Sequence, residues 1–252
     1  MRPGDLDLEL TGNDESKPPV VLLHGLTFDR TMWAPLVASL GDRRVMTLDL
    51  PGHGVSARRD SYAPREVAEV VHEAVTAAGL SRPVVVGHSI GGLLATVYAA
   101  HHPARAVLNI DQPLLVGPFR EMLQSAEPVL RGPDYLRVWN QLLAGMGLDE
   151  LEPSLRTHLR STPRQDLLLG YWQEVLDEPS ESLREQRSLE LTALQRSGTP
   201  YHYVSRNPVP DGYEVWLRDH LPDIGITVLP GSGHFPHLAQ PEALVAILAG
   251  WD

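Results

Sequence analysis

Short runs of apolar residues, separated by segments with a helical pattern, constrain the fold of this chain most strongly. The runs cover residues 20–23 (VVLL), 44–48 and 83–86. Runs of this length are typical of parallel strands that are buried on both faces. Residues 64–80 repeat valine and alanine at helical spacing, and residues 31–40 also have a helical pattern. Strands that alternate with helices predict an α/β fold with a mostly parallel sheet flanked by helices.

The same alternation continues along the rest of the chain. Residues 6–10 alternate apolar with acidic side chains, which is typical of a half-exposed edge strand. We also predict strands at 106–110, 200–204 and 224–229, and helices from Ser89 to His102, near 213–220 and at 241–248.

A long segment without strand-like runs interrupts the pattern. Residues 114–195 are rich in Leu, Glu, Arg and Gln, with recurring Pro and Gly breaks, which predicts a helical insertion. We therefore expect a core domain made of residues 1–112 and 197–252, with residues 113–196 inserted into it. A length of 252 residues suits one α/β domain with such an insertion.

Composition excludes several classes of protein. A net charge of −11 disfavours nucleic-acid phosphates and anionic lipids, so the expected partner is a small, weakly charged molecule. Without cysteine the chain has no disulfide, thiolate nucleophile or Cys-ligated zinc. Because it has no run of about 18 apolar residues and residues 1–5 lack a secretion signal, we expect a cytoplasmic protein without a membrane partner. We expect it to act as a monomer or a homodimer.

The clearest sign of chemistry is the segment 87–91, Gly-His-Ser-Ile-Gly, between an apolar strand and a helix. A serine nucleophile needs such a strained turn to project its hydroxyl clear of the sheet, and the flanking glycines allow close packing. We therefore predict Ser89 as a nucleophile. The alternative is a turn of small residues without chemistry, because the G-x-S-x-G pattern is short.

A serine hydroxyl needs an adjacent base, and eleven histidines compete for that role. We predict His234, which lies in the segment 231–236 (GSGHFP), after the last expected strand and before the last helix. The alternative is a loop histidine whose hydrogen bonds are satisfied locally.

Four separated motifs carry a family resemblance. They are His24-Gly25, the segment 49–56 (DLPGHGVS), the turn around Ser89, and Gly233-His234. In this order and spacing they resemble the α/β-hydrolase superfamily, in the branch of esterases, lactonases and carbon–carbon hydrolases. The resemblance spans the chain except for the insertion.

The resemblance implies an oxyanion hole made of two backbone N–H groups. One follows the nucleophile and belongs to Ile90, and the other belongs to Leu26, with Thr27 and Phe28 as neighbours that could replace it. It assigns His24 and His53 to loop support rather than to catalysis.

Two aspartates are candidates for the acid that orients His234. Most of the superfamily places this acid after the insertion, where the chain has 207–209 (NPV) and then Asp211, which we expect to start and cap a helix. Another branch takes it from the strand after the nucleophile helix, where Asp111 stands. We favour Asp111, because carboxyl ends of parallel strands gather site residues at one edge. The alternatives are that Asp111 only caps the loop that begins the insertion, or that the site has lost its acid.

The resemblance makes the insertion a cap over the carboxyl edge of the sheet. Its apolar side chains are consistent with a hydrophobic cavity, and we expect Phe119 and Trp139 to bind substrate. Trp33 and His88 flank the predicted site, and we expect them to line it as well. Acidic residues of the insertion are interpreted as a solvated face; they are Glu150, Glu152, Glu174 and Glu178.

The expected function is that of a serine hydrolase that cleaves a carboxylic ester or lactone of moderate size through an acyl-enzyme. The alternatives are a carbon–carbon bond hydrolase or lyase on the same serine and histidine, or a ligand-binding relative without catalysis. Dehalogenases and epoxide hydrolases of this superfamily carry Asp where Ser89 stands. We expect no cofactor and no metal, since the pairs His101-His102 and His234 with His237 lack a carboxylate cluster.

Overall fold

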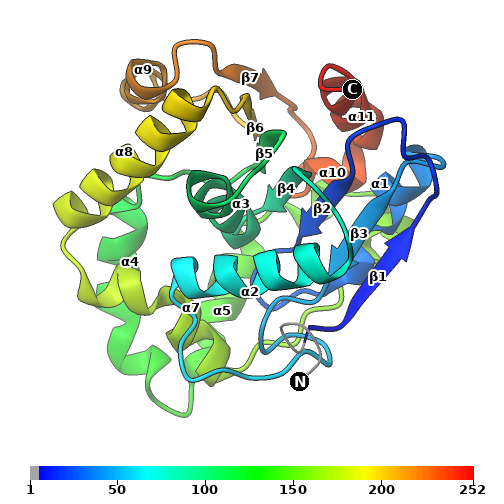
Figure 1. Ribbon diagram of the computed structural model, residues 1–252. Coiled ribbons are helices and arrows are strands. Elements are labelled where there is room, and N and C mark those ends of the chain that lie inside the picture. Colours follow the sequence, from blue (N-terminus) through cyan, green and yellow to red (C-terminus); the bar gives the residue numbers. More distant parts are fainter. Residues whose placement is uncertain (1–5) are drawn as a thin grey trace.

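The computed structural model describes residues 6–252 (Figure 1). Residues 1–5, on which the expectation about a secretion signal rests, lie outside the described residues. The described chain forms a seven-stranded sheet in the order β1-β3-β2-β4-β5-β6-β7. β1 is antiparallel to β3, and all other neighbouring strands are parallel. The predicted α/β fold with a mostly parallel sheet is therefore confirmed.

The strands lie close to their predicted ranges. They are β1 (Leu8–Thr11), β2 (Val20–Leu23), β3 (Val45–Leu48), β4 (Val84–His88), β5 (Ala106–Ile110), β6 (Tyr201–Ser205) and β7 (Gly225–Val228). Every residue of β2, β3, β4 and β5 is buried, because helices cover both faces of the sheet. β1 lies at the edge and is partly exposed, as its alternating sequence indicates.

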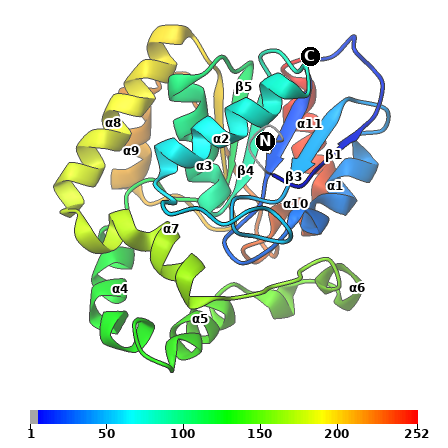
Figure 2. The same ribbon diagram turned by 60° about the horizontal axis from the view of Figure 1, so that its bottom comes forward.

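The helix predicted over 31–40 is divided into two parts. A 3₁₀ turn, η2 (Arg30–Trp33), comes first, and α1 (Ala34–Ser39) follows. Pro35 lies in the first turn of α1, where its missing N–H costs no helical hydrogen bond. α1 packs against α11 (Pro241–Ala249) on one face of the sheet (Figures 1 and 2).

The other face is covered by a continuous row of helices. α2 (Pro64–Ala77) packs against α3 (Ile90–His101), α3 against α8 (Ser180–Ser197), and α8 against α9 (Asp211–His220). The apolar residues that suggested a helix over 64–80 form the buried side of α2. Within residues 6–252, no helix is both long enough and apolar enough to cross a membrane.

Between β5 and β6 the chain adds a set of helices, of which α4, α5, α6 and α7 lie below the sheet in Figure 2. α4 packs against α5 and α7, whereas α8 packs against α3, so α8 belongs to the layer that covers the sheet. The elements of this set that precede α8 are α4 (Gly117–Leu130), α5 (Tyr135–Ala144), η3 (Leu148–Glu150), α6 (Pro153–Arg156) and α7 (Gln165–Asp177).

Candidate active site

Ser89 lies at a sharp turn between β4 and α3. Its φ of 52° and ψ of −130° are backbone angles that residues other than glycine rarely adopt. A Cβ on Gly87 would lie 1.9 Å from the Gly91 carbonyl oxygen, and a Cβ on Gly91 would lie 2.2 Å from the Leu23 oxygen. The turn therefore requires glycine on both sides of Ser89. Its tip is held to the sheet by a 3.0 Å hydrogen bond from the Ser89 N–H to the Ile110 carbonyl.

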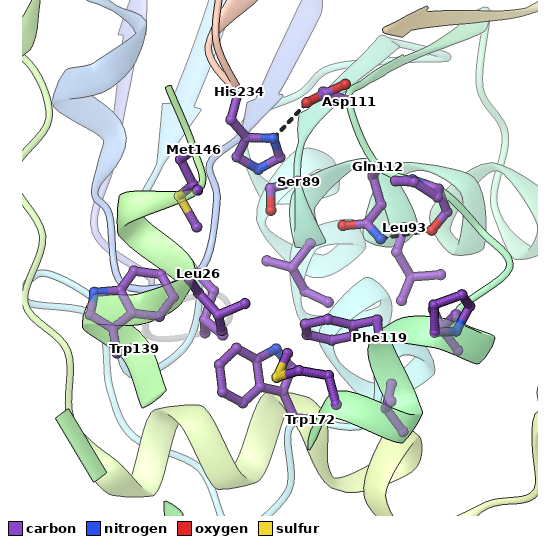
Figure 3. Close-up of a pocket in the computed structure, with 18 of the residues that line it drawn as sticks. Leu26, Ser89, Leu93, Asp111, Gln112, Phe119, Trp139, Met146, Trp172 and His234 are labelled. Carbon is purple, nitrogen blue, oxygen red and sulfur yellow. Dashed lines mark hydrogen bonds and ion pairs between the residues drawn. The ribbon is translucent and has the colours of Figure 1, made fainter. Parts of the chain in front are cut away.

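His234 lies in the loop between β7 and α10 (Pro236–Ala239), beside the end of β5. Its Nδ1 is 2.6 Å from Oδ2 of Asp111, the residue directly after β5 (Figure 3). The second carboxylate oxygen, Oδ1, accepts the Arg206 N–H at 3.1 Å, and the Arg206 Nε lies 3.7 Å from Oδ2. Asp111 is thus fixed by a main-chain donor and by a cation while it contacts the imidazole.

The environment of Asp111 favours its charged form. Burial by itself raises the pKa of this carboxyl group, but the hydrogen bond and charge of His234, together with Arg206, outweigh burial and lower the pKa. The carboxylate is therefore ionised at neutral pH and accepts the Nδ1 proton of His234. This leaves Nε2 of the neutral imidazole as an acceptor.

Ser89 and His234 line the same cavity, and Figure 3 shows the Ser89 side chain next to the imidazole ring, with its oxygen pointing away from the ring. Within residues 6–252 no hydrogen bond joins the two side chains. In unliganded enzymes such contacts are often long and tighten only when substrate binds. The arrangement places a hydroxyl, an imidazole and a carboxylate in one row at the carboxyl edge of the sheet.

Asp211, the other candidate acid, lies away from this row. It is the exposed first residue of α9 and is not among the residues that line the cavity. The expectation that Asp211 caps the helix is wrong, because Pro210 occupies the N-cap position and no side chain caps the helix. Of the two aspartates weighed from the sequence, Asp111 contacts His234.

Two backbone N–H groups beside Ser89 have no acceptor within residues 6–252, and they belong to Leu26 and Ile90. The two neighbours considered as replacements are already engaged. The Thr27 N–H donates to Nε2 of His53 at 3.0 Å, and the Phe28 N–H donates to a carbonyl of its own loop at 3.2 Å. The free pair is suited to hold a developing oxyanion, and the Ile90 N–H also lies at the positive end of the α3 dipole.

Buried His24 and His53 shape the loop that presents Leu26. Nε2 of His24 accepts the Leu50 N–H at 2.9 Å, and its Nδ1 lies 2.8 Å from the Gly25 carbonyl. His53 accepts the Thr27 N–H, and its other nitrogen bonds a backbone carbonyl. Burial lowers the pKa of both histidines, so each is neutral, with one nitrogen as donor and the other as acceptor. These contacts agree with the role in loop support that the resemblance implied.

The cavity in front of Ser89 has a volume of about 580 Å³. Phe119 and Trp139, the two residues of the insertion predicted to bind substrate, line this cavity (Figure 3). Within residues 6–252, no three His, Asp or Glu side chains converge in a way that could hold a metal ion. Most of the lining is apolar. The helices of the insertion contribute Phe119, Met122, Val138, Trp139, Leu142 and Trp172, and the turn after α5 contributes Met146.

Trp33 and His88 do not line the cavity, which corrects the expectation from the sequence. Trp33 is fully buried, and its ring centroid lies 4.6 Å from that of His237. His88 ends β4, and its buried ring packs among His234, Phe235 and His237. Its Nε2 donates to the His234 carbonyl at 2.6 Å. His88 is next to Ser89 in the sequence, but its ring lies behind the site, where it holds the loop of His234.

Arg206 is the site residue that sequence reasoning missed. It follows β6 directly, lines the cavity and contacts Asp111 through its main chain and its guanidinium group. Its position after a predicted strand could have indicated it. The carboxyl ends of β4 and β5 carry Ser89 and Asp111, and the neighbouring end of β6 carries Arg206.

We expect the buried histidines behind the site to make the fold labile to acid. Both ring nitrogens of His237 are buried without a partner within residues 6–252, and burial lowers its pKa to about 3. In the unfolded chain this histidine binds a proton near pH 6.5, whereas in the folded chain it stays neutral down to about pH 3. The free energy of unfolding is therefore highest above pH 6.5 and decreases as the pH falls towards 3. His237→Leu should reduce the slope of unfolding free energy against pH by up to about 1.4 kcal/mol per pH unit. Urea unfolding between pH 7 and about 5 measures it, and parallel curves for variant and wild type would contradict it.

Comparison with known proteins decides the family. The model of the alpha/beta hydrolase family matches residues 20–247. The chain belongs to this family. The match includes the turn around Ser89 and the loop of His234, and the seven-stranded sheet has the corresponding architecture.

Individual members of the α/β-hydrolase family resemble the chain over nearly its whole length. A 2-succinyl-6-hydroxy-2,4-cyclohexadiene-1-carboxylate synthase of Enterobacter sp. (strain 638) is 29% identical, over 92% of this chain and 90% of that protein. A pimeloyl-[acyl-carrier protein] methyl ester esterase of Nitrosomonas europaea is 27% identical, over 96% and 97%. The structure of Est816, described as an N-acyl homoserine lactone degrading enzyme, aligns with a TM-score of 0.75 and 21% identity, over 98% and 96%. That structural likeness supports the fold.

Proposed function

We propose that this protein is a serine hydrolase that cleaves a carboxylic ester or lactone of a moderately hydrophobic small molecule through an acyl-enzyme on Ser89. The observation that carries the proposal is the 2.6 Å contact between Asp111 Oδ2 and His234 Nδ1, in the cavity that Ser89 lines. A buried carboxylate that fixes the imidazole leaves its other nitrogen free to take the serine proton.

The reaction follows from the positions of these groups. Nε2 of His234 removes the hydroxyl proton of Ser89 as its oxygen attacks the carbonyl carbon. The N–H groups of Leu26 and Ile90 bind the oxyanion of the tetrahedral intermediate, and Asp111 stabilises the imidazolium. The imidazolium then protonates the leaving alcohol. Water, deprotonated by His234, releases the acyl group from Ser89 and regenerates the hydroxyl.

The size and the lining of the cavity are suited to a small apolar substrate. Its volume of about 580 Å³ is within the range of pockets that enclose small organic molecules, and its walls are mainly apolar and aromatic. The ionisable side chains that line it are Asp111, Arg206 and His234, and Asp111 contacts both of the others. An acyl group with an apolar chain, or a lactone ring with an apolar substituent, fits these walls better than a highly charged substrate.

A panel of aryl esters of increasing acyl length, together with lactones, tests the proposal. We expect kcat/KM to rise by up to about fourfold for each added methylene, because each buried methylene contributes about 0.8 kcal/mol. The rise should stop when the acyl chain fills the cavity. If the protein hydrolyses none of the esters and lactones of the panel, the proposed function is refuted.

A carbon–carbon bond hydrolase or lyase on the same serine and histidine is the second candidate. The 29% identity to the 2-succinyl-6-hydroxy-2,4-cyclohexadiene-1-carboxylate synthase of Enterobacter favours it over ester hydrolysis only in that this relative is named as a synthase of a carbocyclic acid and not as an esterase. The two candidates differ in whether esters are turned over through a covalent acyl-enzyme. If the protein leaves every ester intact but cleaves a carbon–carbon bond of a diketone or of a cyclohexadiene acid, the result supports the second candidate.

A further inference from the structure

The loop that carries His234 is bonded to the insertion through two consecutive main-chain groups. The His234 N–H donates to the Met146 carbonyl at 2.7 Å. The Gly233 N–H donates to Oε2 of Glu150 at 3.2 Å. Both acceptors lie in the segment 145–150, which follows α5 and ends with η3. The position of the imidazole therefore depends on the insertion as well as on the sheet.

The two loops also touch backbone to backbone. Gly233 has a φ of 53°, and a Cβ there would lie 2.5 Å from the Gly147 carbonyl oxygen and 2.8 Å from that of Met146. Gly147 has a φ of 68°, and a Cβ there would lie 2.9 Å from the Gly233 Cα. Only glycine fits at either position of this junction. Such close contact transmits a displacement of one loop directly to the other.

The core holds the same histidine from the other side. The His234 carbonyl accepts the 2.6 Å hydrogen bond from the buried ring of His88, while its N–H is held by Met146. Arg206, which fixes Asp111, also reaches the insertion, because its Nη1 donates to the Gly145 carbonyl at 3.0 Å. The base and the residue that orients its acid thus share one neighbour, the segment 145–150.

Glu150 lies on an exposed face, as the sequence predicts, and it also supplies the side-chain contact of this junction. The residue is exposed, but its carboxylate accepts the Gly233 N–H. Hydrogen bonds from an N–H to a charged acceptor are stronger than those between neutral groups. The carboxylate therefore fixes the residue directly before His234.

Resting on the proposed function, we propose that the segment 145–150 positions the base of the reaction and that Glu150 is its positioning residue. Met146 gives the segment a second role, because its carbonyl holds His234 while the residue also lines the cavity. An acyl group that packs on Met146 presses on the element that orients the imidazole. The insertion thereby links a filled cavity to an aligned base. Loss of the contacts between the segment 145–150 and the loop of His234 should therefore affect kcat more than KM.

Three variants test the proposal by ester hydrolysis. Glu150→Ala removes the acceptor, and we expect kcat to fall about three- to tenfold, the effect of losing one typical hydrogen bond at an exposed residue, with KM unchanged. Glu150→Gln keeps an acceptor oxygen and should restore most of kcat. Glu152→Ala is the matched control, since Glu152 is an exposed glutamate two residues beyond the segment 145–150 and caps no helix with its side chain. Wild-type kcat in Glu150→Ala, or an equal loss in Glu152→Ala, would overturn the proposal.

A measurement that needs no substrate separates this proposal from the proposed function. Nδ1 of His234 lies 2.6 Å from Oδ2 of Asp111, so the proton between them should give a downfield imidazole signal in ¹H–¹⁵N spectra. We expect this signal to broaden or shift in Glu150→Ala and to persist in Glu150→Gln and Glu152→Ala. If the wild type hydrolyses no ester but the signal responds in this way, the function fails and the positioning role stands. An unchanged signal in Glu150→Ala overturns the positioning role.

Discussion

Asp111→Asn is expected to lower kcat for an aryl ester by about ten-thousand-fold, the usual effect of replacing the orienting acid by its amide. Asparagine keeps the size of the side chain but removes the charge that stabilises the imidazolium. Its amide group also donates hydrogen bonds, so it selects the imidazole tautomer whose Nε2 carries the proton and cannot accept the one from Ser89. Initial rates at saturating substrate measure the loss.

Asp211→Asn provides the matched control, since it makes the same chemical change at the other aspartate. Asp211 is exposed at the start of α9 and does not line the cavity, so kcat should stay within about twofold of the wild type. Urea unfolding of both variants shows whether the Asp111 change acts on the site or on the fold. A large loss in Asp211→Asn with an active Asp111→Asn would reverse the assignment of the acid.

Ser89→Ala should abolish turnover, with a loss of about a million-fold in kcat as for removal of other serine nucleophiles. The variant should fold, because the Ser89 hydroxyl makes no hydrogen bond within residues 6–252 and alanine needs no additional space. Hydrolysis of the aryl ester at the wild-type rate by a pure Ser89→Ala sample would show that another group is the nucleophile. A circular dichroism spectrum and an unfolding curve serve as the control for folding.

The sheet could be predicted because burial on both faces leaves a simple trace in the sequence. Valine and leucine fill β2 and the first three positions of β4, and the helices between them repeat apolar residues at their own spacing. Ser89 could be found for a related reason, since a strand followed by glycines and a helix defines the turn that a nucleophile needs. Asp111 was favoured from its place at the end of β5, next to β4, and it lies 2.6 Å from His234.

The contacts of single side chains could not be predicted in the same way. His88 is adjacent to Ser89 in sequence, but its ring turns into the core towards the His234 carbonyl, and Trp33 is buried against His237. The partner of Glu150 lies 83 residues further along the chain, and only the fold brings them together. Local patterns determine the elements, whereas these contacts depend on how the insertion and the last loop meet.

The most direct test of the central claim is the reaction of the wild-type protein with a fluorophosphonate, followed by mass analysis of the whole chain and of its peptides. The phosphorus centre accepts the activated serine oxygen and places its own oxygen where the oxyanion would lie. We predict one phosphonyl group per chain, on Ser89, with ester hydrolysis lost in proportion to labelling. Ester hydrolysis that persists in a fully labelled sample, or a label carried by a residue other than Ser89, would contradict the account.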